Sequence, residues 1–325
     1  MNVRHACGMS AVLTALTATP APAQEVYPVR PIRLVVAIPA GSGTDTVARL
    51  IADGLSQRLG ARVVVDNRPG GGTIIGNEIV AKAKADGYTL LMNGAALAIA
   101  PSMYRKVPYD TVRDFAPITL AVISPNVLAV HPSLPATSVK ELVALARAKP
   151  DQILYSSGGH GVNSHLATAL FAHMASIRLR HVPYKGSTPG VVALLGGEVA
   201  LMTNSLSTLL GHINAGKVRA LGVGSLKRAV AAPNIPTIAE AGLPGYEASQ
   251  WSALFAPAGT PRDIIAKLHA ETVAVVRDAD ISRKLIEGGA DIVAGTPDEL
   301  AAFFHAELAK WPGVIRAAGL SPDAE

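Results

Sequence analysis

The chain contains almost no cysteine and few aromatic residues. Cys7 is the one cysteine in 325 residues, and phenylalanine, tryptophan and tyrosine together make up 4% of the sequence. A single thiol excludes a disulfide framework within the chain, so stability has to come from a large hydrophobic core. The few aromatic side chains also leave little surface for stacking on nucleic-acid bases. A disulfide-stapled scaffold and a base-stacking protein are both disfavoured.

Dense runs of basic charge are missing as well. The formal net charge is +5, but the 29 lysine and arginine residues are spread along the whole sequence. Nucleic-acid-binding domains gather such residues into a patch or stripe, so no nucleic-acid partner is expected. A small positive balance does favour the approach of an anionic solute, although only weakly at moderate salt.

Apolar runs are short, and the most distinctive one lies at the beginning. An apolar and small-residue stretch covers residues 6–18, and residues 21–23 carry the small side chains that a signal peptidase reads. No segment reaches the ~20 uninterrupted apolar residues that a membrane helix needs. Cys7 lacks the upstream apolar residues of a lipoprotein signal. We therefore expect residues 1–23 to be a signal peptide, the mature chain to start near Gln24, and the product to be soluble in the periplasm.

The usual catalytic motifs are absent from the sequence. The glycine clusters at residues 41–43 and 70–72 match neither a nucleophile elbow, a dinucleotide fingerprint nor a phosphate loop with its lysine. His160 and His165 are five residues apart and have no third ligand close by in sequence, which argues against a metal site. We expect no cofactor, no metal and no enzymatic activity. An enzyme would have to use a catalytic arrangement of serine or histidine residues that no sequence motif indicates.

A regular alternation of strand and helix patterns does run through the chain. Residues 32–38 are mostly β-branched and predict a strand buried on both faces, and residues 45–59 carry apolar residues at helical spacing before Gly60. Further strands are predicted at 62–66, 88–92, 153–156, 178–183, 199–203 and 218–223, and further helices at 74–85, 139–148, 164–175, 189–195, 207–215, 261–278, 280–288 and 297–318. This order predicts an α/β fold with a parallel sheet covered by helices.

Two long extended stretches interrupt the alternation. Residues 115–131 contain Pro117 and Pro125 and are followed by Pro132, and residues 251–256 follow a loop rich in proline and glycine. We interpret both as crossovers between two domains. The prediction is a discontinuous first domain, residues 24–122 and 227–325, and an inserted second domain, residues 123–226.

Three loops of small residues each follow a predicted strand and precede a helix, at 39–45, 93–95 and 156–164. At the carboxyl end of a parallel strand such loops expose backbone N–H groups and direct a helix N-terminus outward, which favours an anion. If the first two loops belong to one domain and the third to the other, closing the cleft brings both sets of donors onto one carboxylate. Taken singly, each loop is more often an ordinary tight turn.

Individual polar residues in these loops have more than one possible role. Thr44 or Asp45 is expected to cap the first helix, and Asp45 can pair with Arg49 one turn later. Ser164 is expected to cap the helix that carries His165. His165 either bonds the loop that precedes it or contacts a ligand, and the sequence leaves both roles open.

Short motifs along nearly the whole mature chain resemble one known family. Each motif alone is modest, but their order is specific. Together they are similar to the tripartite tricarboxylate transporter substrate-binding proteins, the Bug receptors. The motifs are residues 27–28, 31–33, 43–45 with 48–49, 65–70, 86–90, 165–166, 182–186, 216–221, 257–261, Trp311 and 317–319.

The resemblance implies a periplasmic binding protein type II-like fold, in which two α/β domains joined by two crossover strands close like a Venus flytrap around a carboxylic acid. It implies a monomer that binds a small-molecule carboxylate and delivers it to the permease subunits of a membrane transporter. Carried over by position, it implies ligand contacts from Ala40, Gly41, Ser42, Thr44, Asp45, Asn93, Ala95, Ser156, Gly159, Gly161, Asn163, His165, Tyr184 and Asn204.

This chain departs from the family's pattern at several positions. It has Ala37-Ile38 where a proline and an aromatic residue are common, Ser42 in place of a second glycine, and no acid near Ala200 or at Asn204. Ala169 also replaces a frequent glutamate. These changes alter the pocket wall and its charge, so the ligand of this chain cannot be inferred from the acid that a relative binds. A sensor subunit that presents its ligand to a signalling protein, or an enzyme acting on carboxylates, remain the alternative functions.

Overall fold

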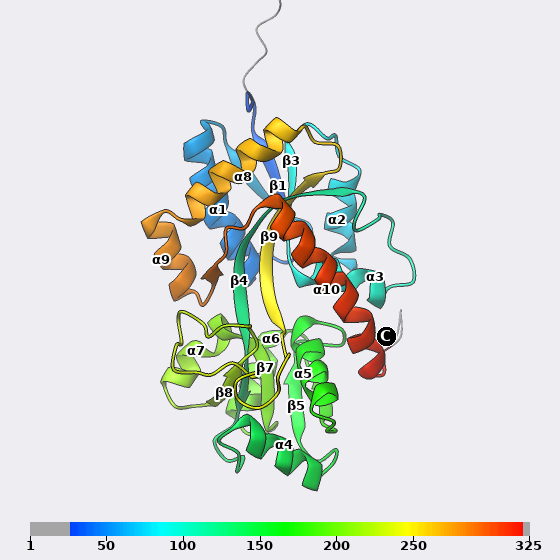
Figure 1. Cartoon of the computed structure of the whole chain (residues 1–325), viewed down its shortest axis with the longest axis vertical. Coiled ribbons are helices and arrows are strands. Elements are labelled where there is room, and N and C mark those ends of the chain that lie inside the picture. The colour runs from blue at the N-terminus through cyan, green and yellow to red at the C-terminus, as the bar shows by residue number, and fades with distance from the viewer. Residues whose placement is uncertain (1–26, 321–325) are drawn as a thin grey trace, which may run out of the picture.

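The computed structural model describes residues 27–320, so the predicted signal peptide lies outside the described residues. The described chain forms two lobes that share two long strands, β4 (Phe115–Val130) and β9 (Ser249–Pro257), which run between the lobes (Figure 1). Nine residue pairs of β4 and β9 match in antiparallel register. These strands include both stretches that the sequence predicted as crossovers.

The first lobe contains both ends of the described chain. Its sheet has the order β2-β1-β3-β9-β4, with β10 paired to the first half of β4. Its elements are β1 (Ile32–Val36), α1 (Gly43–Leu59), β2 (Val63–Asn67), η1 (Gly71–Thr73), α2 (Ile74–Ala81), β3 (Thr89–Asn93), α3 (Ala95–Met103), α8 (Arg262–Val276), α9 (Ala279–Glu287), β10 (Asp291–Ile292) and α10 (Pro297–Ala317).

The second lobe is built from the middle of the chain. Its sheet continues from β4 through β7 and β5 to β6, and β8 pairs with the other edge of β4. Its elements are α4 (Val139–Ala148), β5 (Leu154–Ser157), α5 (Asn163–Met174), β6 (Arg180–Pro183), α6 (Ser187–Leu195), β7 (Leu201–Ser205), α7 (Leu206–Asn214) and β8 (Arg219–Val223).

Helices cover both faces of this sheet, as strand burial requires. In β1, Ile32, Leu34 and Val36 pack with α1 and α8, while Val35 belongs to the core on the opposite face. α10 lies along that opposite face and reaches from the first lobe down to α5 (Figure 1). Its start is fixed by a capping box, in which Thr296 and Glu299 each bond the other's backbone N–H.

Strand directions decide where the site can be. β3 runs antiparallel to β9, and β1 is parallel to β3, so the carboxyl ends of β1 and β3 point toward the second lobe. In the second lobe, β7 is antiparallel to β4 and pairs Ser205 with Asn126, while β5 is parallel to β7. The carboxyl ends of both sets therefore face the boundary between the lobes, which is where α/β folds bind ligands.

The predicted strands and helices are confirmed, with ends shifted by one to four residues. The predicted parallel pairing is confirmed for β1, β2 and β3 and for β5, β6 and β7, whereas β4, β8 and β9 at the centre are antiparallel to their neighbours. The two crossovers impose this, since one strand leaves the first lobe and the other returns. The bounds of α3 and the two-residue strand β10 were not predicted. None of the helices in residues 27–320 is both long and apolar enough to cross a membrane.

Candidate ligand site between the lobes

Asp45 organises the loop that follows β1. Its side chain is 2% exposed and accepts hydrogen bonds from the Gly41 N–H at 2.8 Å, Arg49 Nε at 3.0 Å and Asn67 Nδ2 at 2.8 Å. Burial alone would raise the pKa of Asp45, but the hydrogen bonds from Arg49, Gly41 and Asn67 and the charge of Arg49 hold it below its usual value. The carboxylate therefore stays charged and fixes the loop. The predicted pairing with Arg49 is confirmed.

This loop leaves amides free at the first turn of α1. Ser42, rather than Thr44 or Asp45, is the N-cap, and its Oγ accepts from the Asp45 N–H at 3.3 Å. Within residues 27–320, no acceptor is seen for the N–H groups of Gly43 and Thr44. Unsatisfied amides at a helix N-terminus form an anion-binding site.

Two asparagines play matching roles at the ends of β3 and β7. Asn93 Oδ1 accepts the N–H of the next residue, Gly94, at 2.8 Å, and Asn204 Oδ1 accepts the N–H of Ser205 at 2.8 Å. Asn93 also donates to Asn77 Oδ1 at 2.7 Å and is 1% exposed. One lobe thus repeats the turn of the other, and both side chains shape the backbone at the lobe boundary.

His165 anchors the loop after β5 from behind. The Gly161 N–H donates to His165 Nδ1 at 3.0 Å, so a neutral ring carries its proton on Nε2. Ser157 Oγ accepts the Gly159 N–H and donates to the Gly159 carbonyl, which ties the loop a second time. Of the two roles that the sequence left open for His165, the structure shows the bond to the preceding loop.

The first turn of α5 offers a second set of free amides. Its N-cap is Val162, and Ser164 accepts from the Gly158 N–H instead of capping the helix, so the predicted cap was wrong. No acceptor is seen within residues 27–320 for the N–H groups of Asn163 and Ser164. The buried amide Nδ2 of Asn163 also lacks a partner there. A carboxylate would satisfy such donors.

Three histidines gather behind this loop, and sequence spacing had missed one of them. The rings of His165 and His181 stack with centroids 3.9 Å apart and planes 6° apart, and His160 meets both edge-on. One nitrogen from each lies within 4.8 Å of the others, so the argument that no third ligand is available was wrong. Because the rings of His165 and His181 are stacked, however, their in-plane nitrogen lone pairs lie in parallel planes. One ion could bind nitrogens of both rings only after one ring had rotated.

Burial keeps the stacked pair neutral. It lowers the pKa of His165 to about 3, helped by the nearby His181 and His160, and it lowers the pKa of His181 to about 4, helped by His160. A neutral His165 is what the Gly161 bond requires, because a proton on Nδ1 would face another donor.

Stability is expected to fall as pH drops from about 6.5 toward 4. In that window the unfolded chain takes up protons on His165 and His181, while the folded protein does not, so each ring costs about 1.4 kcal/mol per pH unit. Chemical denaturation of wild type and of a His165→Asn, His181→Asn double variant between pH 7 and 4 measures this. The variant should lose most of the slope. An equal slope in both proteins would contradict the assignment.

The residues that the sequence predicted as ligand contacts differ in whether they present a free group at the lobe boundary. Gly41, Gly159 and Gly161 line the loops, but their N–H groups are used internally, so they are not free donors in this state. Ser156 is fully buried and its hydroxyl bonds the Gly190 carbonyl, so its side chain does not line the cleft. Tyr184 turns its hydroxyl toward Glu198. Ala40, Ser42, Thr44, Asp45, Asn93, Ala95, Asn163, His165 and Asn204 lie in or directly beside the loops at the lobe boundary.

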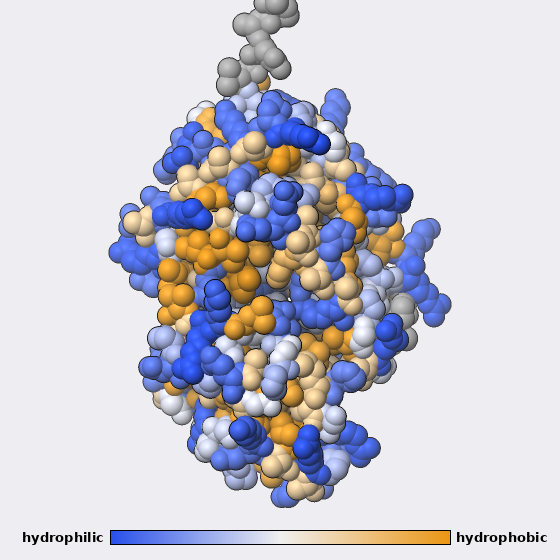
Figure 2. All heavy atoms as spheres, in the orientation of Figure 1, coloured by the Kyte–Doolittle hydropathy of each residue, from blue (hydrophilic) through white to orange (hydrophobic). Residues whose placement is uncertain are grey.

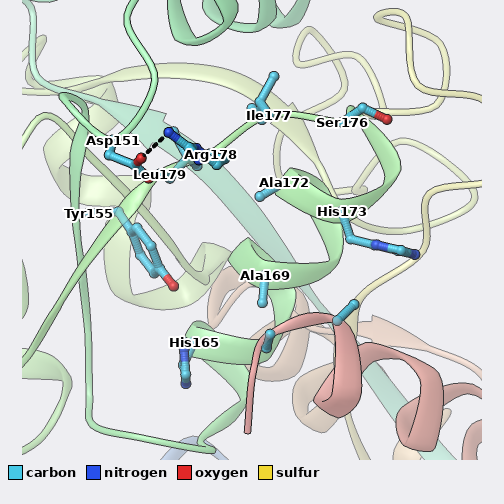
Figure 3. A pocket seen from close by; sticks show the side chains of 12 residues that line it. Asp151, Tyr155, His165, Ala169, Ala172, His173, Ser176, Ile177, Arg178 and Leu179 are labelled. Carbon is cyan, nitrogen blue, oxygen red and sulfur yellow. Dashed lines mark ion pairs between the residues drawn. The ribbon is translucent and has the colours of Figure 1, made fainter.

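A pocket of about 520 Å³ lies between α5 and the end of α10. Figure 3 shows side chains that line it, among them Tyr155 and His165, and the ion pair of Asp151 and Arg178. No residue of the loop at 39–45 lines this pocket. It shares His165 with the predicted ligand residues, but none of the four residues with free amides, Gly43, Thr44, Asn163 and Ser164, lines it. On the face shown in Figure 2, hydrophilic residues are spread over both lobes, in line with the dispersed charge of the sequence.

Two α/β lobes whose loops meet at a shared boundary define a type II-like solute-binding receptor. The sequence pattern of the "Tripartite tricarboxylate transporter family receptor" matches residues 47–320, and the chain belongs to this family. The family consists of solute-binding receptors and not of enzymes.

Relatives and solved structures agree with this assignment. Protein BugT of Bordetella pertussis is 36% identical, covering 98% of this chain and 99% of its own. The structure titled R. palustris Rpa4515 with adipate has a TM-score of 0.80 at 38% identity, over 91% of this chain and 99% of that chain. MatC from Rhodopseudomonas palustris with bound malate has a TM-score of 0.74 at 30% identity, over 89% and 100%.

Proposed function

We propose that this protein is a periplasmic receptor that captures a small carboxylate between its lobes and delivers it to a tripartite tricarboxylate-type permease. The observation that carries the proposal is the pair of free helix N-termini, Gly43-Thr44 of α1 and Asn163-Ser164 of α5, which belong to different lobes and follow strands that end at their boundary. A single carboxylate between them would satisfy donors from both sides.

The chemistry is capture without reaction. In the open form the amides of each lobe are hydrated, and on closure the ligand's carboxylate replaces that water at both helix ends. Closure is driven only by the extra affinity of the closed form, so the tighter the second lobe holds the acid, the larger the closed fraction. Asp45, Asn93, His165 and Asn204 hold the loops in place and take no proton from the ligand.

The ligand we favour is a linear dicarboxylate. Two of the similar solved structures contain adipate and malate, which are acids of this class. Aromatic acids, tricarboxylates and amino acids are the other classes to include in a screen, since Ala37-Ile38 and Asn204 change the wall and charge of the pocket relative to the family pattern.

A bound dicarboxylate is expected to raise the melting temperature on the order of 5 °C at a hundredfold excess over its Kd, and to reduce the radius of gyration in solution scattering. Thermal shift with adipate and malate measures the first effect. Dimethyl adipate, which has the same chain but no charge, is the matched control and should give no shift. Equal shifts with acid and ester, or none across the whole screen, would count against the proposal.

A further inference from the structure

Met103 and Gly161 touch across the boundary between the lobes. Met103 is the last residue of α3 in the first lobe, and Gly161 lies in the loop before α5 in the second. A Cβ built on Gly161 would lie 2.4 Å from Met103 Cε and 3.4 Å from its sulfur. The thioether therefore rests on the bare backbone of the glycine. A side chain at position 161 would have to displace the end of Met103.

Gly161 is held rigidly where Met103 meets it. Its φ of +70° favours glycine, and its N–H is bonded to the Nδ1 of the buried His165 at 3.0 Å. His165 is in turn stacked on His181. The contact surface is thus fixed from behind by two neutral rings and does not give way when the lobes approach.

Both partners belong to segments at the lobe boundary. The loop of Gly161 passes directly into Asn163 and Ser164, the first residues of α5, which carry the second lobe's free donors. α3 begins at Ala95, next to the turn that Asn93 organises, and ends at Met103. A movement of the second lobe's donors relative to α3 therefore changes this contact as well.

We infer that Met103 is the residue by which the first lobe closes onto the second, with Gly161 as its seat. The contact exists only when the lobes are together, so it favours the closed state over the open one. The expected effect on affinity rests on the proposed function, because the closed fraction matters to binding only if the ligand lies between the lobes. Since the apparent Kd rises as the closed fraction falls, loss of the contact weakens binding without touching the ligand.

The test measures lobe separation directly. Spin labels on cysteines at Gln57 of α1 and Ala144 of α4, both exposed and in different lobes, report the distance distribution with and without saturating adipate. Gly161→Ala is expected to shift the distribution to longer distances in both conditions and to weaken adipate binding about tenfold, because its Cβ displaces Met103 Cε from this position. Met103→Ala is expected to weaken binding about fivefold through the lost contact.

The double variant separates the contact from backbone strain. Combining Gly161→Ala with Met103→Ala removes the clash, so its distances should return to those of Met103→Ala alone. Gly216→Ala, at φ +67° in the second lobe with open space around it, and Met174→Ala in α5 are the matched controls and should leave distances and affinity unchanged.

Each outcome decides the inference. An unchanged distribution in Gly161→Ala would overturn it, because the contact would then not hold the lobes together. A double variant as open as Gly161→Ala alone would also overturn it, because strain at position 161 would then explain the data. If wild type binds neither adipate nor malate, the proposed ligand class fails, while the distances without ligand still decide whether Met103 closes the lobes.

Discussion

Replacing Asp45 by alanine is expected to weaken carboxylate binding by about 10- to 100-fold while leaving the fold intact, a change of roughly 1.4–2.7 kcal/mol. The carboxylate accepts from the Gly41 N–H, Arg49 and Asn67, and it is almost fully buried. Without it these donors lose their shared acceptor, and the turn that presents the Gly43 and Thr44 amides loses its fixed shape. Calorimetric titration with the best acid from the thermal-shift screen measures the loss.

Asp53→Ala is the matched control for this experiment. Asp53 lies on the same helix two turns later and is exposed. Its replacement is expected to leave the affinity for the acid unchanged. Circular dichroism of both variants should match wild type. An Asp45→Ala protein that binds as tightly as wild type would remove the loop after β1 from the site.

Replacing Glu307 by alanine is expected to lower the free energy of unfolding by about 3–5 kcal/mol, because it leaves two buried indole N–H groups without their acceptor and removes one of the two carboxylates paired with Lys310. The Glu307 carboxylate is 3% exposed and accepts from Trp251 Nε1 at 2.9 Å and Trp311 Nε1 at 3.3 Å, and it pairs with Lys310. Lys310 also pairs with Glu247 at 2.6 Å. These contacts join α10 to the segment that leads into β9.

The charge on Lys310 depends on this network. Burial alone would lower the pKa of Lys310, but Glu247 and Glu307 raise it above its usual value. Urea denaturation of Glu307→Ala against the exposed Glu287→Ala measures the difference, and only the first variant should shift its midpoint. Equal midpoints for both variants would show that the network contributes nothing to stability.

Much of the fold was accessible from the sequence because its signals are local. The β-branched run in β1, the stop at Gly60 and the helical spacing of α10 are properties of neighbouring residues, and the structure confirms each element. α3 was harder, since its residues are apolar on nearly every side and Pro101 lies inside it. β10 has only two residues and exists because β4 supplies a partner.

The site was accessible in outline but not in its details. Small residues after strands marked the right loops, yet which amides are free depends on side chains that reach back, as Asp45 does to Gly41 and His165 to Gly161. His181 joins His165 through the pairing of β5 with β6, and Met103 reaches Gly161 from the other lobe. Such contacts are set by tertiary packing, which leaves no trace in local spacing.

The central claim is that backbone amides of α1 and α5 hold one carboxylate between the lobes. A crystal structure with adipate, or with the best acid from the screen, tests it most directly. We expect one carboxylate within hydrogen-bonding distance, directly or through one water, of the Gly43 or Thr44 N–H and of the Asn163 or Ser164 N–H. An acid bound instead in the pocket between α5 and the end of α10, which none of these four residues lines, would contradict the account.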